Sequence, residues 1–415
     1  MQHGPSPTQP AVANVWRATF AGLCASLVGI GLARFAYTPL IPVLVTEQWF
    51  EPSQAAYLGA ANLAGYLVGA LGARWMTAIA PVSVVLRTLM LLATASFFAC
   101  AYPVSFSWFF LWRFTAGVSG GALMVLAALA VLPHVPASRR GLAGGAIFTG
   151  VGLGIVVSGT LVPLLLRFGL GTTWQGLGVV ALALTLLAWT GWPNAANGPD
   201  TTAQRDESRP RSSAALKALY VEYGLNAVGL VPHMVFLVDF VVRGLGQGLA
   251  AGARYWVIFG LGAVLGPMLA GTAADRVGFR PALRLGFLVQ AVAVALVAVT
   301  DRPVALMLSS AIVGAFVPGV VPLALGRVQE LATDDRDRKI AWSWCTAAFA
   351  LGQAGAAYAF SYVFTRSGGA YLPLFVAGAG ALLLALAIDL VWPRAPEAGN
   401  QHGEVDREPD ARVPN

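Results

Sequence analysis

The sequence contains about twelve apolar segments, each long enough to cross a lipid bilayer, and this feature constrains the fold most. A spanning helix needs roughly 20 mainly apolar residues. Such segments account for most of the 415 residues, and only 11% of the residues are charged, against about 25% in a typical soluble domain. In lipid, a helix satisfies its own backbone hydrogen bonds. The sequence therefore predicts an all-α membrane protein.

Hydropathy predicts about twelve transmembrane helices, six on each side of a polar interval. The predicted spans are 16–45, 53–74, 81–102, 106–133, 141–166, 174–192, 215–241, 253–274, 282–300, 304–327, 340–364 and 371–392. We expect two six-helix bundles, residues 15–192 and 215–392, joined by a linker at 193–214. Tails at 1–14 and 393–415 flank them.

The basic residues predict the orientation of the chain. Clusters of arginine and lysine recur in alternate loops, at 139–140, 205–217, 276–284 and 336–339. Because cytoplasmic loops are enriched in these residues, that side is the cytoplasm, and an even number of spans places both termini there. We expect the inner (plasma) membrane. The net charge of +7 reflects these loops, and no basic stripe interleaved with aromatic residues indicates nucleic-acid binding.

The motifs argue against an enzyme. The sequence has no clustered acids, paired His/Asp metal ligands or Ser/His/Asp arrangement, and no G-x-x-x-x-G-K-[ST] loop for a nucleotide. Cys24, Cys100 and Cys345 lie far apart in apolar segments, without metal-ligand spacing. We expect no metal and no cofactor. A polytopic membrane enzyme or a transporter-like sensor remains the alternative, although no polar segment is long enough for a signalling domain.

A weak internal repeat relates the two groups of spans. Residues 69–74 (GALGAR) end the second span, and residues 271–276 (GTAADR) end the eighth, at an offset of 202. Gly117 and Gly314, in the fourth and tenth spans, are separated by 197 residues. Parallel six-helix repeats of this kind are typical of a large class of secondary transporters.

The loop after the eighth span carries the sharpest motif. Residues 271–280 read GTAADRVGFR and resemble the G-x-x-x-D-R-x-G-x-R loop signature of the major facilitator superfamily. In the first half, Gly69 and Arg74 match this signature, and Ala73 replaces its aspartate. Arg113-x-x-x-Gly117 in the fourth span is similar to the second motif of that superfamily.

The first span is similar to one branch of the same superfamily. Residues 29–42, GIGLARFAYTPLIP, resemble the opening of the YbfB/YjiJ-type proteins. The resemblance implies a monomeric, proton-coupled secondary transporter that moves a small solute by alternating access, but it supplies no substrate. The fifth span lacks the Gly-Pro pair of the exporter signature, so export of drugs or apolar metabolites by proton antiport is the alternative.

Charged residues inside the spans are candidates for transport chemistry, because a charge at the centre of a helix in lipid costs about 2.5–3.5 kcal/mol. Arg34 lies midway along the first span, before Tyr37 and two prolines, Pro39 and Pro42, that favour a bend. A guanidinium offers forked donors to a carboxylate, phosphate or sulfonate. We therefore predict that Arg34 and Tyr37 bind an organic anion; the alternative for Arg34 is an ion pair with another helix.

Glu222 lies well inside the seventh span and shares a helical face with Asn226. Because burial favours the neutral carboxyl, we predict that Glu222 carries a coupling proton and that Asn226 contacts substrate. The alternative is a pairing of Glu222 with a neighbouring helix. The resemblance links Arg113 to proton movement, while its chemistry equally allows it to orient substrate or to serve the structure alone.

Asp275, Arg276 and Arg280 belong to the loop motif at a predicted cytoplasmic helix end. The resemblance implies that this loop holds neighbouring helices together in one conformation, and release of such a contact permits rocking. We therefore expect these residues to gate transport. Two polar sites in the seventh span are expected to be structural, namely a hydrogen-bonded core His233 and a local pair between Asp239 and Arg243.

Overall fold

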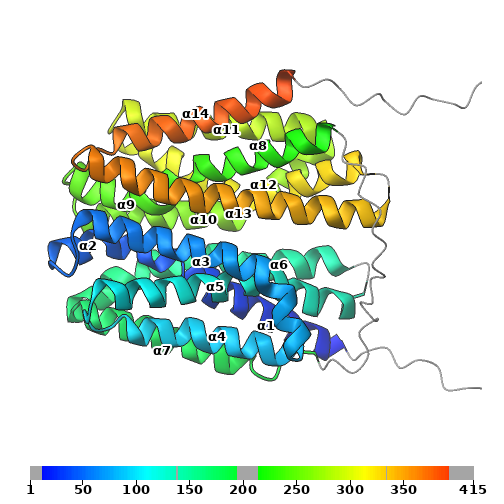
Figure 1. Cartoon of the computed structure of the whole chain (residues 1–415), viewed down its shortest axis with the longest axis horizontal. Coiled ribbons are helices and arrows are strands. Elements are labelled where there is room, and N and C mark those ends of the chain that lie inside the picture. Colours follow the sequence, from blue (N-terminus) through cyan, green and yellow to red (C-terminus); the bar gives the residue numbers. More distant parts are fainter. Residues whose placement is uncertain (1–11, 137–138, 194–213, 333, 392–415) are drawn as a thin grey trace, which may run out of the picture.

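The computed structural model describes residues 12–136, 139–193, 214–332 and 334–391, and within these ranges the chain forms helices and no strand. Figure 1 shows two lobes, one built from α1 to α7 and the other from α8 to α14. The predicted linker and the two predicted tails lie almost wholly outside the described residues, so their boundaries stay predictions.

The first lobe begins with an interrupted helix and continues with five longer ones. Its elements are α1 (Val12–Ser26), η1 (Leu27–Leu32), η2 (Phe35–Leu40), α2 (Ile41–Thr46), α3 (Pro52–Ile79), α4 (Val82–Ala99), α5 (Phe106–Val131), η3 (Leu132–His134), α6 (Arg140–Leu165), η5 (Leu166–Phe168) and α7 (Leu170–Ala188).

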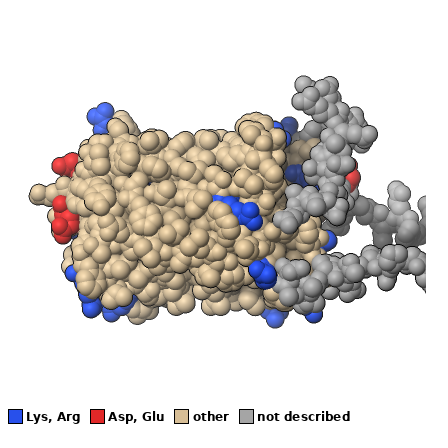
Figure 2. Space-filling model, turned by 90° about the horizontal axis from the view of Figure 1, so that it is seen from below, with Lys and Arg blue, Asp and Glu red and all other residues tan. Residues whose placement is uncertain are grey.

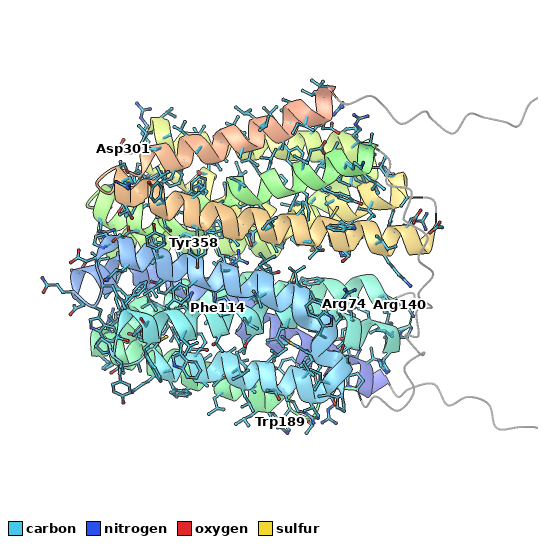
Figure 3. All side chains as sticks on the ribbon, viewed as in Figure 1. Arg74, Phe114, Arg140, Trp189, Asp301 and Tyr358 are labelled. Atoms are coloured by element: carbon cyan, nitrogen blue, oxygen red, sulfur yellow. The ribbon has the colours of Figure 1, made fainter. Side chains whose placement is uncertain are left out.

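The second lobe follows the same plan. Its elements are α8 (Ala214–Val231), η7 (Pro232–Phe236), α9 (Leu237–Asp239), η8 (Phe240–Gly244), α10 (Leu249–Val277), α11 (Phe279–Val299), α12 (Pro303–Leu331), α13 (Asp335–Arg366) and α14 (Leu372–Val391). The start of α1 and the end of α14 lie at one end of the molecule, which we call the terminal end (Figure 1). The loop of Asp301 lies at the opposite, far end (Figure 3).

Eleven described helices are long and apolar enough to cross a membrane. The twelfth, α13, has 32 residues and contains the predicted span 340–364. It is less apolar than the others because glycine, glutamine, serine and threonine interrupt its apolar sequence. α13 packs against α8 in its own lobe and against α3 in the other, so much of it faces protein. With α13 as the twelfth span, the described residues agree with the predicted two groups of six helices.

The surface agrees with a membrane-spanning fold. On the face shown in Figure 2, most charged side chains lie near the two ends, around a broad uncharged band. Many large apolar side chains are exposed along the helices, among them Leu129, Leu187 and Met268 at 66%, 63% and 72%. Lipid is the solvent that makes such exposure favourable.

Two helices in each lobe pack backbone against backbone through glycine. A Cβ added to Gly69 on α3 would lie 2.0 Å from the main-chain oxygen of Val118 on α5. A Cβ on Gly266 of α10 would lie 1.8 Å from that of Ala315 on α12. No side chain fits in either place, which is how small residues allow close helix contacts in lipid.

These contacts correct the predicted repeat. Gly69 and Gly266 occupy equivalent places and are 197 residues apart, the same offset as Gly117 and Gly314. The alignment of Gly69 with Gly271 is wrong, because a Cβ on Gly271 would meet nothing within 4 Å. α3 and α10 also begin 197 residues apart, at Pro52 and Leu249. Residues 69–74 and 271–276 have similar residue types near helix ends, and this similarity led to an offset five residues too large.

The first span of each lobe is interrupted at the boundary between the lobes. In the first lobe, the π-helical η1 leads through a turn at Ala33 and Arg34 into the 3-10 helix η2, which contains Pro39. In the second, the π-helical η7 begins at Pro232. Proline lacks the N–H that a regular helix needs, and π-helical turns are frequent at functional sites.

Candidate functional site

A small cavity of about 20 Å³ lies where the interrupted helices meet. The first lobe contributes most of the wall and the second lobe the remainder. The lining residues are Arg34, Tyr37, Thr38, Ile41, Gly59, Asn62, Leu63 and Arg113 from the first lobe, and Met234 and Val235 from the second. The two lobes therefore share this cavity.

Arg34 lies at the interruption of the first span. Its guanidinium carbon is 5.0 Å from the ring centroid of Phe35 and 5.1 Å from that of Tyr66, so aromatic faces partly compensate its charge. Nη2 contacts Sδ of Met234 in the other lobe at 3.7 Å. Nε is buried without a hydrogen-bond partner. Among the described residues, Arg34 forms no ion pair.

Arg113 reaches the same cavity from α5 and is only 3% exposed. Its Nη1 donates to the main-chain oxygen of Ala33 at 2.7 Å, and its guanidinium carbon lies 4.2 Å from the ring centroid of Tyr37. Nε of Arg113 is also buried without a partner. Nδ2 of Asn62 donates to the main-chain oxygen of Arg113 at 3.1 Å, which fixes α3 against α5 at this level.

The cavity wall supplies no carboxylate to these two arginines. Asp239 is the acid whose charge acts on the nearby Tyr37. Its carboxylate is bound to Arg243 and accepts a hydrogen bond from Oη of Tyr371 at 2.7 Å. Tyr37 donates its own hydroxyl to the main-chain oxygen of Ala55 at 2.8 Å. The cavity is therefore cationic.

The second lobe contributes polar contacts that the sequence analysis missed. Oγ1 of Thr38 donates to the main-chain oxygen of Met234 at 2.6 Å, and Nε2 of Gln353 contacts Sδ of Met234 at 3.6 Å. Oε1 of the buried Gln353 has no partner. Asn62 and Gln353 are uncharged amides within apolar segments, a signal that could have marked them.

Glu222 and Asn226 do not line this cavity. Asn226 donates from Nδ2 to Oε1 of Gln290 at 2.9 Å, and both side chains are buried. Glu222 is 3% exposed. The structure thus separates these two residues of the second lobe from Arg34, Tyr37 and Arg113, which it brings together.

The charged neighbours of Glu222 come from three helices packed near α8. They are Arg280 and Arg284 on α11, Arg327 on α12 and Asp389 on α14. No described residue donates a hydrogen bond to the Glu222 carboxyl. Glu222 therefore interacts with a charge network of its own, distinct from the cationic cavity.

The three residues of the loop motif differ in their surroundings. Asp275 and Arg276 are exposed, and neither forms a hydrogen bond or ion pair within the described part of the chain. Arg280 instead donates from Nε to Oδ1 of Asp389 at 3.0 Å. The structure therefore places Arg280 in a contact between α11 and α14, apart from Asp275.

The seventh span holds the two polar contacts expected to be structural. Nε2 of His233 lies 2.7 Å from Oγ of Ser309, whose hydroxyl donates to the main-chain oxygen of Ala293 at 2.6 Å. Nε2 is thus the donor in the first contact. Asp239 and Arg243 form an ion pair four residues apart.

Contacts between the lobes continue from the cavity toward the far end. The ring centroids of Phe35 and Trp256 are 6.1 Å apart, and Nε1 of Trp256 donates to Oγ of Ser158 at 3.1 Å. Tyr358, labelled in Figure 3, faces the first lobe, and its ring centroid lies 6.3 Å from that of Tyr57. Aromatic rings and short polar contacts thus join the lobes here.

The fold is similar to those of several solved transporters. A D-xylose-proton symporter superposes with a TM-score of 0.70 at 17% identity, covering 90% of this chain and 96% of that one. The xylose transporter XylE from E. coli, partially occluded and inward open, gives 0.70 at 15% identity, covering 91% and 97%. A mutant of the nucleoside transporter NupG gives 0.72 at 13%, covering 90% and 99%. A comparison with curated proteins finds no match.

A family model extends the likeness from fold to sequence. The model described as uncharacterised MFS-type transporter YbfB matches residues 26–390, a range that includes both the opening of the first span and the loop motif. The resemblance drawn from those residues is confirmed. The family and the structural neighbours are transporters, not enzymes. This multi-pass membrane protein therefore belongs to the major facilitator superfamily, in the family of the uncharacterised MFS-type transporter YbfB.

Proposed function

We propose that this protein is a secondary active transporter that carries a small organic anion across the inner membrane by alternating access, coupled to protons. The observation that carries this proposal is the position of Arg34. Its guanidinium lines a cavity between the lobes and has no acidic partner among the described residues. Arg34 is thus available to a ligand.

Burial of the Arg34 charge without a counter-ion is costly. An ion removed from water without a counter-ion is strongly unfavourable, and aromatic faces supply only part of the compensation. A guanidinium binds a carboxylate through two parallel hydrogen bonds, which adds geometric selectivity. An anionic solute would therefore supply Arg34 with both a counter-charge and hydrogen-bond acceptors for its free N–H groups.

The place of the cavity supports alternating access. Arg34 and Thr38 of the first lobe contact Met234 of the second, so separation of the lobes at this level would break these contacts and uncover the arginine. Interrupted helices at the interface of two repeats are the usual location of substrate sites in such transporters.

Proton coupling is assigned to Glu222. Its carboxyl is buried, receives no hydrogen bond from the described residues, and lies near Arg280, Arg284 and Asp389. One structural neighbour is described as a D-xylose-proton symporter, so this fold supports such coupling. Because Glu222 does not line the Arg34 cavity, the proton and the anion would be linked through the equilibrium between conformations rather than by contact.

The test compares two variants in proteoliposomes loaded with buffer at controlled pH, with a panel of radiolabelled organic anions. Arg34→Lys should weaken anion binding because an ammonium does not reproduce the fork. Glu222→Gln should abolish accumulation driven by a proton gradient and retain exchange of anion down its own gradient. Arg167→Lys, at an exposed position away from the cavity, is the control for Arg34→Lys.

Two results would contradict the proposal. Normal anion binding by Arg34→Lys would make Arg34 a structural residue and favour a neutral or cationic solute. Accumulation against a gradient by Glu222→Gln would remove the coupling role from Glu222 while leaving anion transport intact.

A further inference from the structure

We infer that Arg113 is a second ligand of the transported anion, and that Arg34 and Arg113 together select a dianion over a monoanion. This inference rests on the proposed function and names the class of its substrate. The family resemblance of its motif links Arg113 to proton movement, whereas the contacts around its guanidinium favour a direct role in binding.

Arg113 has unused hydrogen-bonding capacity. A guanidinium has five N–H donors, and the one hydrogen bond described for this side chain runs from Nη1 to the main-chain oxygen of Ala33. Nε is buried and has no partner. Buried polar groups are normally satisfied, so the free donors of a side chain that is 3% exposed at a cavity wall indicate a ligand.

The charges of the two guanidinium groups are not balanced by a nearby acid among the described residues. Arg34 and Arg113 line one cavity, and neither forms an ion pair with a described residue. The hydroxyl groups in the wall are already used, since Tyr37 donates to Ala55 and Thr38 donates to Met234. A dianion would neutralise both guanidinium groups, whereas a monoanion would leave one buried charge uncompensated.

The internal repeat places an uncharged residue at the position equivalent to Arg113. At the offset of 197 residues, Arg113 corresponds to Ser310 on α12, and the glycines one turn later, Gly117 and Gly314, pack in the same way. Ser310 is buried in turn. The helix pair therefore forms without a charge at this position. Packing alone does not account for an arginine in the first lobe.

The site is asymmetric between the lobes. Both cations belong to the first lobe, while the second lobe presents Met234 and Val235, with the free Oε1 of Gln353 behind Met234. A bound solute would direct its charged groups to the first lobe and its uncharged part to the second. Closure of the second lobe over the solute would then require no further charge.

The experiment compares anions of equal chain length on purified full-length protein. Succinate and malonate serve as dianions and butyrate as the monoanion, each titrated by ligand-induced thermal stabilisation and by competition with radiolabelled succinate uptake. Wild type should bind a dianion at least about tenfold more tightly than butyrate, a difference of about 1.4 kcal/mol. Arg113→Gln should reduce that preference to near unity, chiefly through lost dianion affinity.

Two further variants separate binding from folding. Arg113→Lys keeps the charge and can reach the oxygen of Ala33, so it should fold and still lose several-fold of the dianion preference because the fork is lost. Ser310→Ala, at the equivalent position of the second lobe, should leave the preference unchanged. A change in folding alone would lower the melting temperature and leave the ratio of the two affinities unaltered.

The outcomes distinguish this inference from the proposed function. Equal affinity for succinate and butyrate in wild type, or an unchanged preference in both Arg113 variants, would overturn the role of Arg113 while anion transport through Arg34 stands. Binding of neither class of anion would overturn the proposed function as well.

Discussion

Arg280 on α11 binds Asp389 on α14 through two hydrogen bonds, from Nε to Oδ1 at 3.0 Å and from Nη2 to the main-chain oxygen at 2.8 Å. Arg284, one turn later, binds the same carboxylate. The first lobe has a related contact, in which Nε of Arg87 donates to the main-chain oxygen of Trp189 at 2.9 Å. Arg87 and Arg284 are 197 residues apart. In both lobes, an arginine of the third span thus donates to the end of the sixth span. In the second lobe the acceptor includes the carboxylate of Asp389.

Asp389→Asn should destabilise the second lobe. The substitution removes the negative charge between two arginines, and hydrogen bonds to charged groups contribute about 1.5–3 kcal/mol. We expect a lower melting temperature in detergent, measured by light scattering or intrinsic fluorescence. Asp301→Asn, an exposed position at the far end, is the matched control. Equal melting temperatures for the two variants would show that the arginine contacts contribute little.

Gly69→Ala and Gly266→Ala should each impair folding or insertion. The new Cβ would lie 2.0 Å or less from a main-chain oxygen that belongs to the neighbouring helix, and overpacking of this kind costs about 1–3 kcal/mol or more. Gly271→Ala, with nothing within 4 Å of its Cβ, should fold normally. Yield of monodisperse protein and melting temperature measure the difference. Similar behaviour of all three variants would contradict the backbone packing.

Asp275→Asn should fold and insert but change the balance between conformations. Asp275 has no partner within the described residues in this conformation, so any contact it makes in the other conformation would be lost selectively. A charge-assisted contact of about 1.4 kcal/mol changes such an equilibrium about tenfold. Cysteine accessibility from the two ends of the cavity measures the balance. Unchanged accessibility and unchanged transport rates would remove the gating role from this residue.

The terminal end should face the cytoplasm, as the distribution of basic residues predicts. A cysteine at Phe168, which is 69% exposed at the far end, should react with a membrane-impermeant maleimide added outside intact cells. Phe168 is preferable to Gly169, whose φ of 99° disfavours cysteine. A cysteine at the exposed His134 should react only after permeabilisation. The reverse pattern would invert the proposed topology.

The sequence predicted the architecture well because the bilayer imposes a length and a polarity on each helix. The family followed from two short motifs, residues 29–42 and 271–280. Hydropathy is weakest for α13, whose small and polar residues suit a helix that packs against both lobes. The predicted offset of 202 residues was wrong for Gly69. Similar residue types at two helix ends do not show which backbone packs against each glycine.

The candidate site was predicted in part. Arg34, Tyr37 and Arg113 were singled out because charges and polar rings within apolar spans are costly, and the structure brings all three to one cavity. Their arrangement depends on where η1 and η2 interrupt the first span, which no local pattern specifies. Met234 contacts the site through its main-chain oxygen and its sulfur. Every methionine has these groups, so the sequence alone does not single out Met234.

The glycine contact between α10 and α12 brings the two backbones into direct contact at Gly266. With no side chain between the backbones at Gly266, no rotamer change can absorb a displacement there. One end of α10 carries Trp256, beside Phe35 and hence next to Arg34, and the other carries Asp275. A tilt of α10 as one unit would therefore move both residues, which are separated along the helix by about 1.5 Å of rise per residue. Asp275 does not line the cavity, yet it shares a helix with the Trp256 ring that packs beside Phe35.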